Sequence, residues 1–152
     1  MPDDTLIVKK LGSVERILVA SKDFLEANGM PKNPSQAKAY DTIGLLPFEG
    51  GKIPLSNEQG KTVYLQPFLK TTTNNIFALK ELVISGLGMA VMPRWFINQE
   101  LEQEQLINLL PEWRAPSLDV HIAYLPGKHQ PLRLRAFAEL MVREVGRIPG
   151  IT

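Results

Sequence analysis

The amino-acid sequence predicts an α/β fold, because runs typical of strands alternate along the chain with segments of helical periodicity. The run Ile17-Leu18-Val19 is continuously apolar, which is typical of a strand buried on both faces. Between residues 76 and 87, apolar residues recur at spacings of three and four and define one face of a helix. The length of 152 residues, with 44% hydrophobic and 22% charged residues, fits one domain or two small lobes.

The first half of the chain is expected to contain five strands and two short helices. Gly12 is expected to end the first strand before the second begins. Ser21 is expected to cap the first helix, which ends at Asn28-Gly29, and Ser35 to cap the second, which ends near Tyr40. The expected strands cover residues 5–11, 14–20, 41–46, 61–65 and 68–72. Those of the middle third are expected to form a small antiparallel patch.

The second half is expected to contain three helices and three strands. The expected strands cover residues 89–92, 106–110 and 120–125, and the helices begin near residues 76, 95 and 131. Pro131 suits the first turn of the last helix, where its missing N–H is tolerated. Its inward stripe would consist of Leu134, Phe137, Met141 and Val145. The last strand and helix look like the edge of a sheet that needs more partners, so we expect an incomplete domain.

Composition excludes several classes of function. The formal net charge is +1, which argues against a nucleic-acid surface held by charge alone. The absence of cysteine excludes disulfides, thiolate zinc sites and thiol catalysis, and His121 and His129 lie too far apart for a helical ligand pair. We therefore expect no metal and no cofactor. No apolar run approaches the roughly 18 residues of a membrane span, and residues 1–5 lack the pattern of a secretion signal.

The residues do not predict catalysis. The glutamates between positions 100 and 104 fit a solvated helix face better than an acid–base pair. There is no G-x-S-x-G motif, and the glycine pair at 86 and 88 closes a helix instead of opening one, so a phosphate loop is not expected. Trp95 and Trp113 could stack on a ligand, although such residues more often anchor the edge of a lobe.

The best candidate site is the uncharged polar run from Thr71 to Asn75, where a strand is expected to end and a helix to begin. Backbone N–H groups at a helix start carry the positive end of the helix dipole, and hydroxyls and amides beside them add neutral donors. This combination suits a small anion such as a carboxylate. The same residues also fit an ordinary helix cap with nothing bound, and the local sequence alone favours that alternative.

Four motifs in order resemble the effector-binding domain of LysR-type transcriptional regulators. The first combines residues 14–21 with Phe24-Leu25, Gly29 and Pro31, and resembles the entry into the second effector lobe. The others are residues 86–93, residues 106–113 and the start of the terminal helix at 131–137. The sequence departs from the family where Lys22 replaces a frequent Pro, Phe24 a common Tyr, and Asn74-Asn75 a frequent Asn-Asp.

The resemblance implies the fold of a type 2 periplasmic binding protein, with a ligand cleft between two lobes. Residues 21–117 would form the complete second effector lobe, and residues 1–20 and 118–152 a remnant of the first lobe with the crossover strands. The family's N-terminal winged helix-turn-helix domain and the opening part of its first lobe have no counterpart in the 152 residues.

The resemblance also implies a sensing function without catalysis. Thr72, Thr73 and Asn74 would line the cleft from the second lobe, and Ser21, near the crossover, is a weaker candidate. The effector would be a small carboxylate or an aromatic metabolite. The complete protein would be a cytoplasmic homo-oligomer that binds promoter DNA through a domain outside these residues, without contact to a membrane.

Two alternatives remain from the sequence. A solute-binding protein of the same fold should carry a secretion signal or lipid anchor, and an enzyme on this architecture needs a nucleophile, metal or proton donor in the cleft. We also expect the chain to self-associate, because missing partner strands would leave sheet edges and apolar surface exposed.

Overall fold

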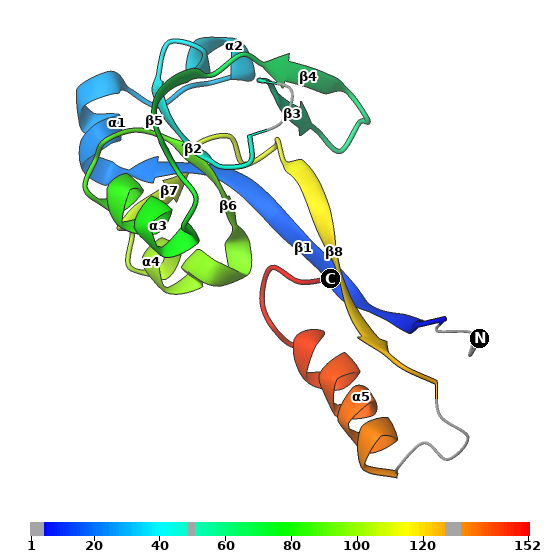
Figure 1. The fold of residues 1–152 in the computed structure, drawn as a ribbon. Coiled ribbons are helices and arrows are strands. Elements are labelled where there is room, and N and C mark those ends of the chain that lie inside the picture. The colour runs from blue at the N-terminus through cyan, green and yellow to red at the C-terminus, as the bar shows by residue number, and fades with distance from the viewer. Residues whose placement is uncertain (1–4, 49–50, 127–131) are drawn as a thin grey trace.

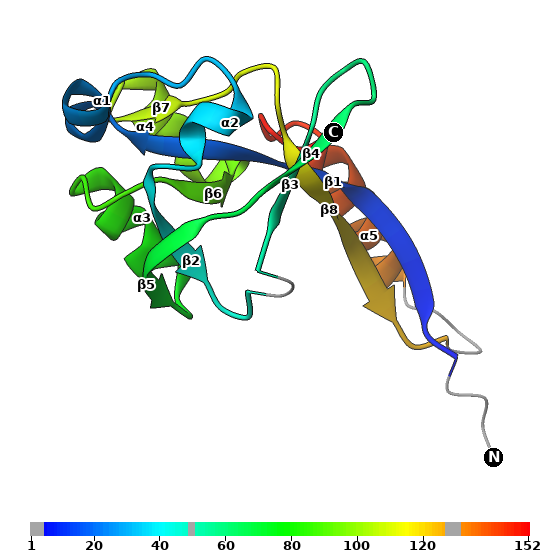
Figure 2. The same cartoon turned by 90° about the horizontal axis from the view of Figure 1, so that it is seen from above.

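The computed structural model describes residues 5–48, 51–126 and 132–152. A rounded α/β lobe occupies one end of the molecule, and an arm extends from it (Figure 1). The arm consists of the outer halves of β1 (Ile7–Ser21) and β8 (Ala115–Tyr124), with α5 (Leu132–Val145) lying along them (Figure 2). No helix among the described residues is both long and apolar enough to cross a membrane.

The strand β1 passes from the arm into the lobe without a break. Its outer half pairs antiparallel with β8, and its inner half pairs antiparallel with β6 (Ala90–Pro93) and β7 (Leu106–Asn108). The prediction of two strands separated at Gly12 was therefore wrong. Gly12 lies at a shift of the β1–β8 register, and a Cβ added there would lie 2.8 Å from Ile151 Cγ2. The glycine permits close packing of the C-terminal residues against a continuous strand.

The strand β8 begins five residues earlier than the sequence predicts. Ala115 pairs with Arg16 and Leu118 with Val14, so residues 115–119, which lie before the expected strand 120–125, are already strand. Pro116 obscured this, because proline demotes a strand in sequence patterns. Pro116 lies beside a second shift in the β1–β8 register, between Val14 and Arg16. Such an irregularity accommodates a proline, which lacks the N–H group that a regular strand pair would use.

Two small sheets complete the lobe. The strands β2 (Asp41–Leu45) and β5 (Phe68–Thr73) are parallel, which corrects the expected all-antiparallel patch. Only β3 (Ile53–Ser56) and β4 (Thr62–Leu65) form an antiparallel pair, and β3 was not predicted. Close approach of Gly88 joins β2 to the main sheet, since a Cβ at Gly88 would lie 2.5 Å from the carbonyl oxygen of Asp41.

The first two helices begin with side-chain caps. The Ser21 hydroxyl accepts a hydrogen bond of 3.1 Å from the Phe24 N–H at the start of α1 (Lys22–Asn28), as predicted. The second helix, α2 (Pro34–Ala37), is capped by Asn33 and not by Ser35, and its 3.1 Å bond comes from the Gln36 N–H. The prediction was two residues late because Pro34 fills the first helical position.

The later helices follow the predicted order. The helix α3 (Ile76–Ile84) is the periodic segment, and the expected helix 95–104 is divided into a 3₁₀ turn, η1 (Arg94–Ile97), followed by α4 (Asn98–Glu102). In α5 the expected inward stripe is partly wrong, because Phe137 is 51% exposed and the neighbouring Ala138 is buried. Pro131 and His129 lie outside the described residues.

The core has two layers on opposite faces of β1. Leu18 and Ala20 face one cluster with α1, the β3–β4 hairpin and Leu109. Ile17 and Val19 face the other cluster with α3 and η1. The prediction of a strand buried on both faces is confirmed, and it explains why this run has no polar alternation.

Candidate effector-binding site

A cavity of about 500 Å³ lies beside β2 and the segment that follows its carboxyl end, from Thr42 to Phe48. We call it the strand-end cavity. The two parallel strands end side by side at Leu45 and Thr73, and the Leu46 N–H donates a 2.7 Å hydrogen bond to the Thr73 carbonyl. In open α/β sheets, ligands bind beyond the carboxyl ends of the strands. The cavity therefore lies where this architecture favours a ligand.

The walls of the strand-end cavity come from both parts of the molecule. The lobe contributes the end of β2, the start of α3 at Ile76, and Val91 and Pro93 of β6. Pro116 and Leu118 of β8 line it as well, at the point where β8 leaves the lobe for the arm. A molecule in the cavity would touch segments that belong to the lobe and to the arm at once.

Two cations, Arg16 and Lys52, line the strand-end cavity together with mostly apolar side chains. None of its described lining residues is an aspartate or a glutamate. Arg16 is half-buried and its Nε donates a 2.7 Å hydrogen bond to the Pro116 carbonyl. Burial lowers the pKa of Arg16, although a guanidinium stays protonated at neutral pH. A half-buried cation without a carboxylate favours an anion nearby.

Two nearby arginines share one carboxylate, whereas Arg16 pairs with none among the described residues. Glu15 pairs with Arg94 at 3.2 Å and with Arg114 at 3.0 Å. In the part of the chain that the structure describes, Arg16 takes part in no ion pair of this kind. The positive charge that remains beside the cavity, next to apolar walls, suits a small organic anion.

None of the predicted residues Thr72, Thr73 and Asn74 lines the strand-end cavity, although each lies close to a residue that does. A Cβ added at Gly44, which lines the cavity, would lie 3.5 Å from Thr72 Cγ2. The Thr73 carbonyl holds the end of β2 through Leu46. Asn74 is exposed and lies two residues before the lining residue Ile76.

The start of α3 is capped from within the chain. The Asn75 side-chain oxygen accepts hydrogen bonds from the Phe77 N–H at 2.9 Å and the Ala78 N–H at 3.2 Å. The Asn75 N–H in turn donates to the Thr73 hydroxyl at 3.2 Å. Asn75 therefore forms an ordinary helix cap. Because its side chain occupies the Phe77 and Ala78 N–H groups, fewer backbone N–H groups can bind an anion here than the sequence predicts.

Ser21 lies at the opposite end of the parallel strands, away from Thr72 and Asn74. A Cβ at Gly86 would lie 3.4 Å from its hydroxyl oxygen. Gly86 lines a separate cavity of about 420 Å³ together with Asp41, the first residue of β2. From Asp41 to Leu45, the partner of Thr73, β2 rises about 13 Å over four residue steps. The structure does not bring Ser21 together with the other candidates.

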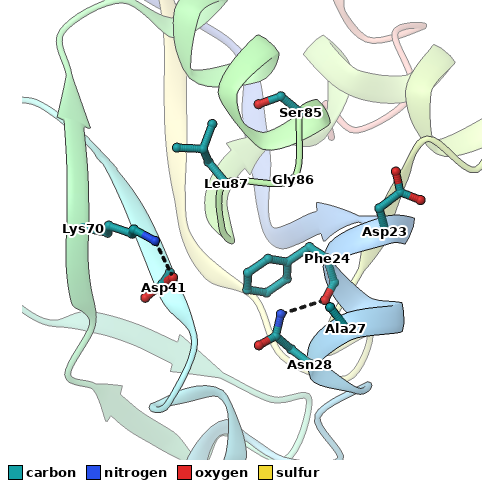
Figure 3. A pocket seen from close by; sticks show the side chains of 9 residues that line it. All are labelled: Asp23, Phe24, Ala27, Asn28, Asp41, Lys70, Ser85, Gly86 and Leu87. Atoms are coloured by element: carbon teal, nitrogen blue, oxygen red, sulfur yellow. Dashed lines mark hydrogen bonds and ion pairs between the residues drawn. The ribbon is translucent and has the colours of Figure 1, made fainter.

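The cavity beside Ser21 is polar (Figure 3). Lys70 reaches across to Asp41 at 3.1 Å, and the Asn28 side chain donates a 2.9 Å hydrogen bond to the Phe24 carbonyl. Ser21 itself is only 3% exposed and its hydroxyl is occupied by the helix cap. Its geometry is that of a structural residue.

Sequence reasoning missed Arg16 and Lys52. Arg16 carried a signal, because it is a cation next to the apolar run 17–19 in a strand that was predicted to be buried. Lys52 carried none that distinguishes it from other lysines. Among the described residues, no group of three or more histidine, aspartate or glutamate side chains is placed to hold a metal ion.

The comparisons with known proteins define the class of this chain. Residues 2–146 match the family model described as the LysR substrate binding domain, so the chain belongs to that family. This confirms the resemblance seen in the sequence. The structural neighbours are regulatory domains of LysR-type regulators, which have the type 2 periplasmic-binding-protein-like fold, and the predicted fold class is confirmed.

Particular relatives are transcriptional regulators. The chain is 28% identical over 88% of its length to an uncharacterized HTH-type transcriptional regulator of Haemophilus influenzae, covering 46% of that protein. It is 26% identical over 97% of its length to the regulator PtxR of Pseudomonas aeruginosa, covering 47% of it. The chain thus spans about half the length of the curated relatives it matches.

Solved structures show the same relationship. The regulatory domain of AphB from Vibrio vulnificus has a TM-score of 0.78 and 28% identity, over 94% of this chain and 71% of that chain. The full-length Vibrio cholerae virulence activator AphB has a TM-score of 0.79 and 26% identity, over 94% of this chain and 49% of that one. The chain covers part of the regulatory domain in the first structure and about half of the full-length protein in the second.

Proposed function

We propose that this chain senses a small organic anion in the strand-end cavity, as the effector-binding part of a LysR-type transcriptional regulator. The observation that supports this most is the pair of cations, Arg16 and Lys52, in a largely apolar cavity without a described carboxylate. A small carboxylate, aliphatic or aromatic, would place its charge between the cations and its carbon skeleton against the apolar walls.

The sensing step would be a shift between two arrangements of lobe and arm. Residues 21–117 would act as the second effector lobe, and residues 1–20 and 118–152 as part of the first lobe. A ligand that touches Arg16 and Leu118 together with Ile76 would bind one arrangement more tightly and so increase its population. This needs no chemical reaction, in keeping with relatives that are named as transcriptional regulators.

Thr72, Thr73 and Asn74 would contribute at the rim of the strand-end cavity. Their hydroxyl and amide groups can hydrogen-bond the polar end of a ligand held by the cations. Ser21 is proposed to act only through the cap of α1, because its hydroxyl is already occupied.

The whole protein would bind promoter DNA as a homo-oligomer in the cytoplasm. This rests on relatives about twice as long as the chain, which are named as HTH-type transcriptional regulators. Effector binding to the chain would then be coupled to a DNA-binding region in the longer protein.

A thermal-shift experiment tests the sensing proposal. The chain is melted with succinate and with benzoate, each added separately, and compared with Arg16→Gln, Lys52→Gln and the control Lys22→Gln, which lies on α1 away from the cavity. At about ten times its Kd, a ligand should stabilise the folded state by about 1.4 kcal/mol. The shift should shrink in the first two variants and persist in the control. If neither acid gives a shift that shrinks when these two cations are replaced, the proposal is contradicted.

A further inference from the structure

A second cavity, of about 380 Å³, lies between α2 and the strand β4. We call it the α2–β4 cavity. The two elements lie side by side on the lobe, on the side away from α5 (Figure 1). The α2–β4 cavity shares no lining residue with the strand-end cavity. It is therefore a separate site that the sensing function does not use.

The inner surface of the α2–β4 cavity is apolar and firmly held. Leu65 of β4 is 1% exposed and belongs to the core. Val63 and Trp113 pack against the same core cluster, and the backbone N–H of Trp113 donates a 2.9 Å hydrogen bond to the Leu110 carbonyl. The hydrogen bond holds the backbone at Trp113, and packing against the core places its indole as an aromatic surface for a ligand. Fixed apolar surface lowers the entropy cost of binding.

An aromatic ring and two cations stand at the outer edge of the cavity. Tyr64 is 64% exposed, an unusual position for a large aromatic side chain without a partner. Lys38 follows α2, and Lys61 precedes β4. The Lys61 backbone is fixed by a 2.9 Å hydrogen bond from its N–H to the Asn57 side chain. The two lysines therefore face the same cavity from different elements.

The charge of the cavity is positive. No aspartate or glutamate is among its described lining residues, and within residues 5–48, 51–126 and 132–152 neither Lys38 nor Lys61 forms an ion pair. An anion would meet two cations and no opposing carboxylate. A flat apolar body would meet Trp113 and Val63 at the same time.

We infer that the α2–β4 cavity binds a planar aromatic carboxylate. The ring would lie against Trp113 and Val63, and the carboxylate would lie between Lys38 and Lys61. Ring and charge are both needed, because exposed lysine–carboxylate pairs alone are weak. A volume of about 380 Å³ is in the range of small-molecule sites.

Fluorescence of Trp113 provides the test. The chain contains two tryptophans, and Trp95→Phe leaves Trp113 as the single reporter. Benzoate should change its fluorescence in a saturable way. Benzyl alcohol, which keeps the ring and lacks the charge, should bind about tenfold more weakly, and benzylamine should not saturate.

Variants assign the response to the cavity. In the Trp95→Phe background, Lys38→Gln and Lys61→Gln should each weaken benzoate binding about two- to fivefold, and together about tenfold. Lys22→Gln is the matched control and should bind benzoate unchanged. All variants are melted first, so that a folding defect is separated from a binding defect.

Two results would overturn the inference. The first is an absence of saturable change at Trp113 in a folded chain. The second is a response that survives Lys38→Gln with Lys61→Gln but disappears with Arg16→Gln, which would assign the binding to the strand-end cavity instead. Because the reporter and the lysines belong to the α2–β4 cavity alone, its failure leaves the proposed sensing function standing.

Discussion

Substitution of Gly12 by alanine should detach the C-terminal residues from β1. The added Cβ would lie 2.8 Å from Ile151 Cγ2 and 3.0 Å from the Thr152 carbonyl oxygen. A side-chain rotation can relieve the first contact but not the second, which is with the backbone. Such overpacking costs about 1–3 kcal/mol.

The hydrogen bonds of the C-terminal residues set an upper limit on this cost. The Ser13 N–H donates to Thr152 at 2.7 Å, the Thr152 N–H donates back to Ser13 at 3.0 Å, and the Glu15 N–H donates to Gly150 at 2.8 Å. At about 0.5–1.5 kcal/mol each, detaching these residues would cost about 1.5–4.5 kcal/mol. Gly12→Ala should lower the free energy of unfolding by less than that, because the C-terminal residues can detach from β1 instead of remaining in the close contact.

A double-mutant cycle in urea measures the effect. Deletion of residues 148–152 removes the atoms that the new Cβ would meet. Gly12→Ala should then be neutral or slightly stabilising, since alanine is less flexible than glycine in a strand. If Gly12→Ala destabilises the shortened chain as much as the full chain, the close-packing explanation of this glycine is refuted.

Three further predictions concern a helix cap, a titrating carboxylate and the arm. Ser21→Ala should lower the free energy of unfolding by about 1 kcal/mol without changing carboxylate binding; if binding is lost, Ser21 belongs to the effector site. Hydrogen bonds from Ser13 and Lys10 lower the pKa of Asp119, so its contribution to stability is present above pH 3.8 and is lost as the pH falls through the lowered value. The free energy of unfolding of Asp119→Asn should therefore equal that of the parent chain at low pH and fall below it at higher pH. A difference between the two that persists at low pH would argue against assigning this stability to the Asp119 carboxylate. Phe137, 51% exposed on α5, should support self-association, and Phe137→Lys should lower the apparent mass in light scattering; a monomeric parent chain would contradict this.

The sequence predicted the order of most elements because local signals agreed with the packing. The cap of α1, the helix α3 and the doubly buried run 17–19 all have strong local patterns. The errors fall where long-range contacts decide. Gly12 looks like a strand end until Ile151 is placed against it, and Pro116 looks like a loop until β1 is placed beside it.

The pairing of β2 with β5 explains how much of the site was predictable. Sequence patterns predicted the strand end at Thr72, one residue before the observed end at Thr73, but did not indicate that this end lies beside Leu46. Arg16 reaches the strand-end cavity through the long-range pairing of β1 with β6 and β8, where its partners Pro93 and Ala115 also line the cavity. The candidates Thr72, Thr73 and Asn74 came from the local pattern, whereas both cations depend on the tertiary fold.

The central claim is that the strand-end cavity takes a small organic anion. The most direct measurement is an NMR titration of the ¹⁵N-labelled chain with succinate and benzoate, added separately. At least one acid should shift the amide signals of Gly44, Leu46 and Ile76 in a saturable way, and Arg16→Gln should weaken the response. Saturable shifts confined to other regions, or none at these amides with either acid, would contradict the account.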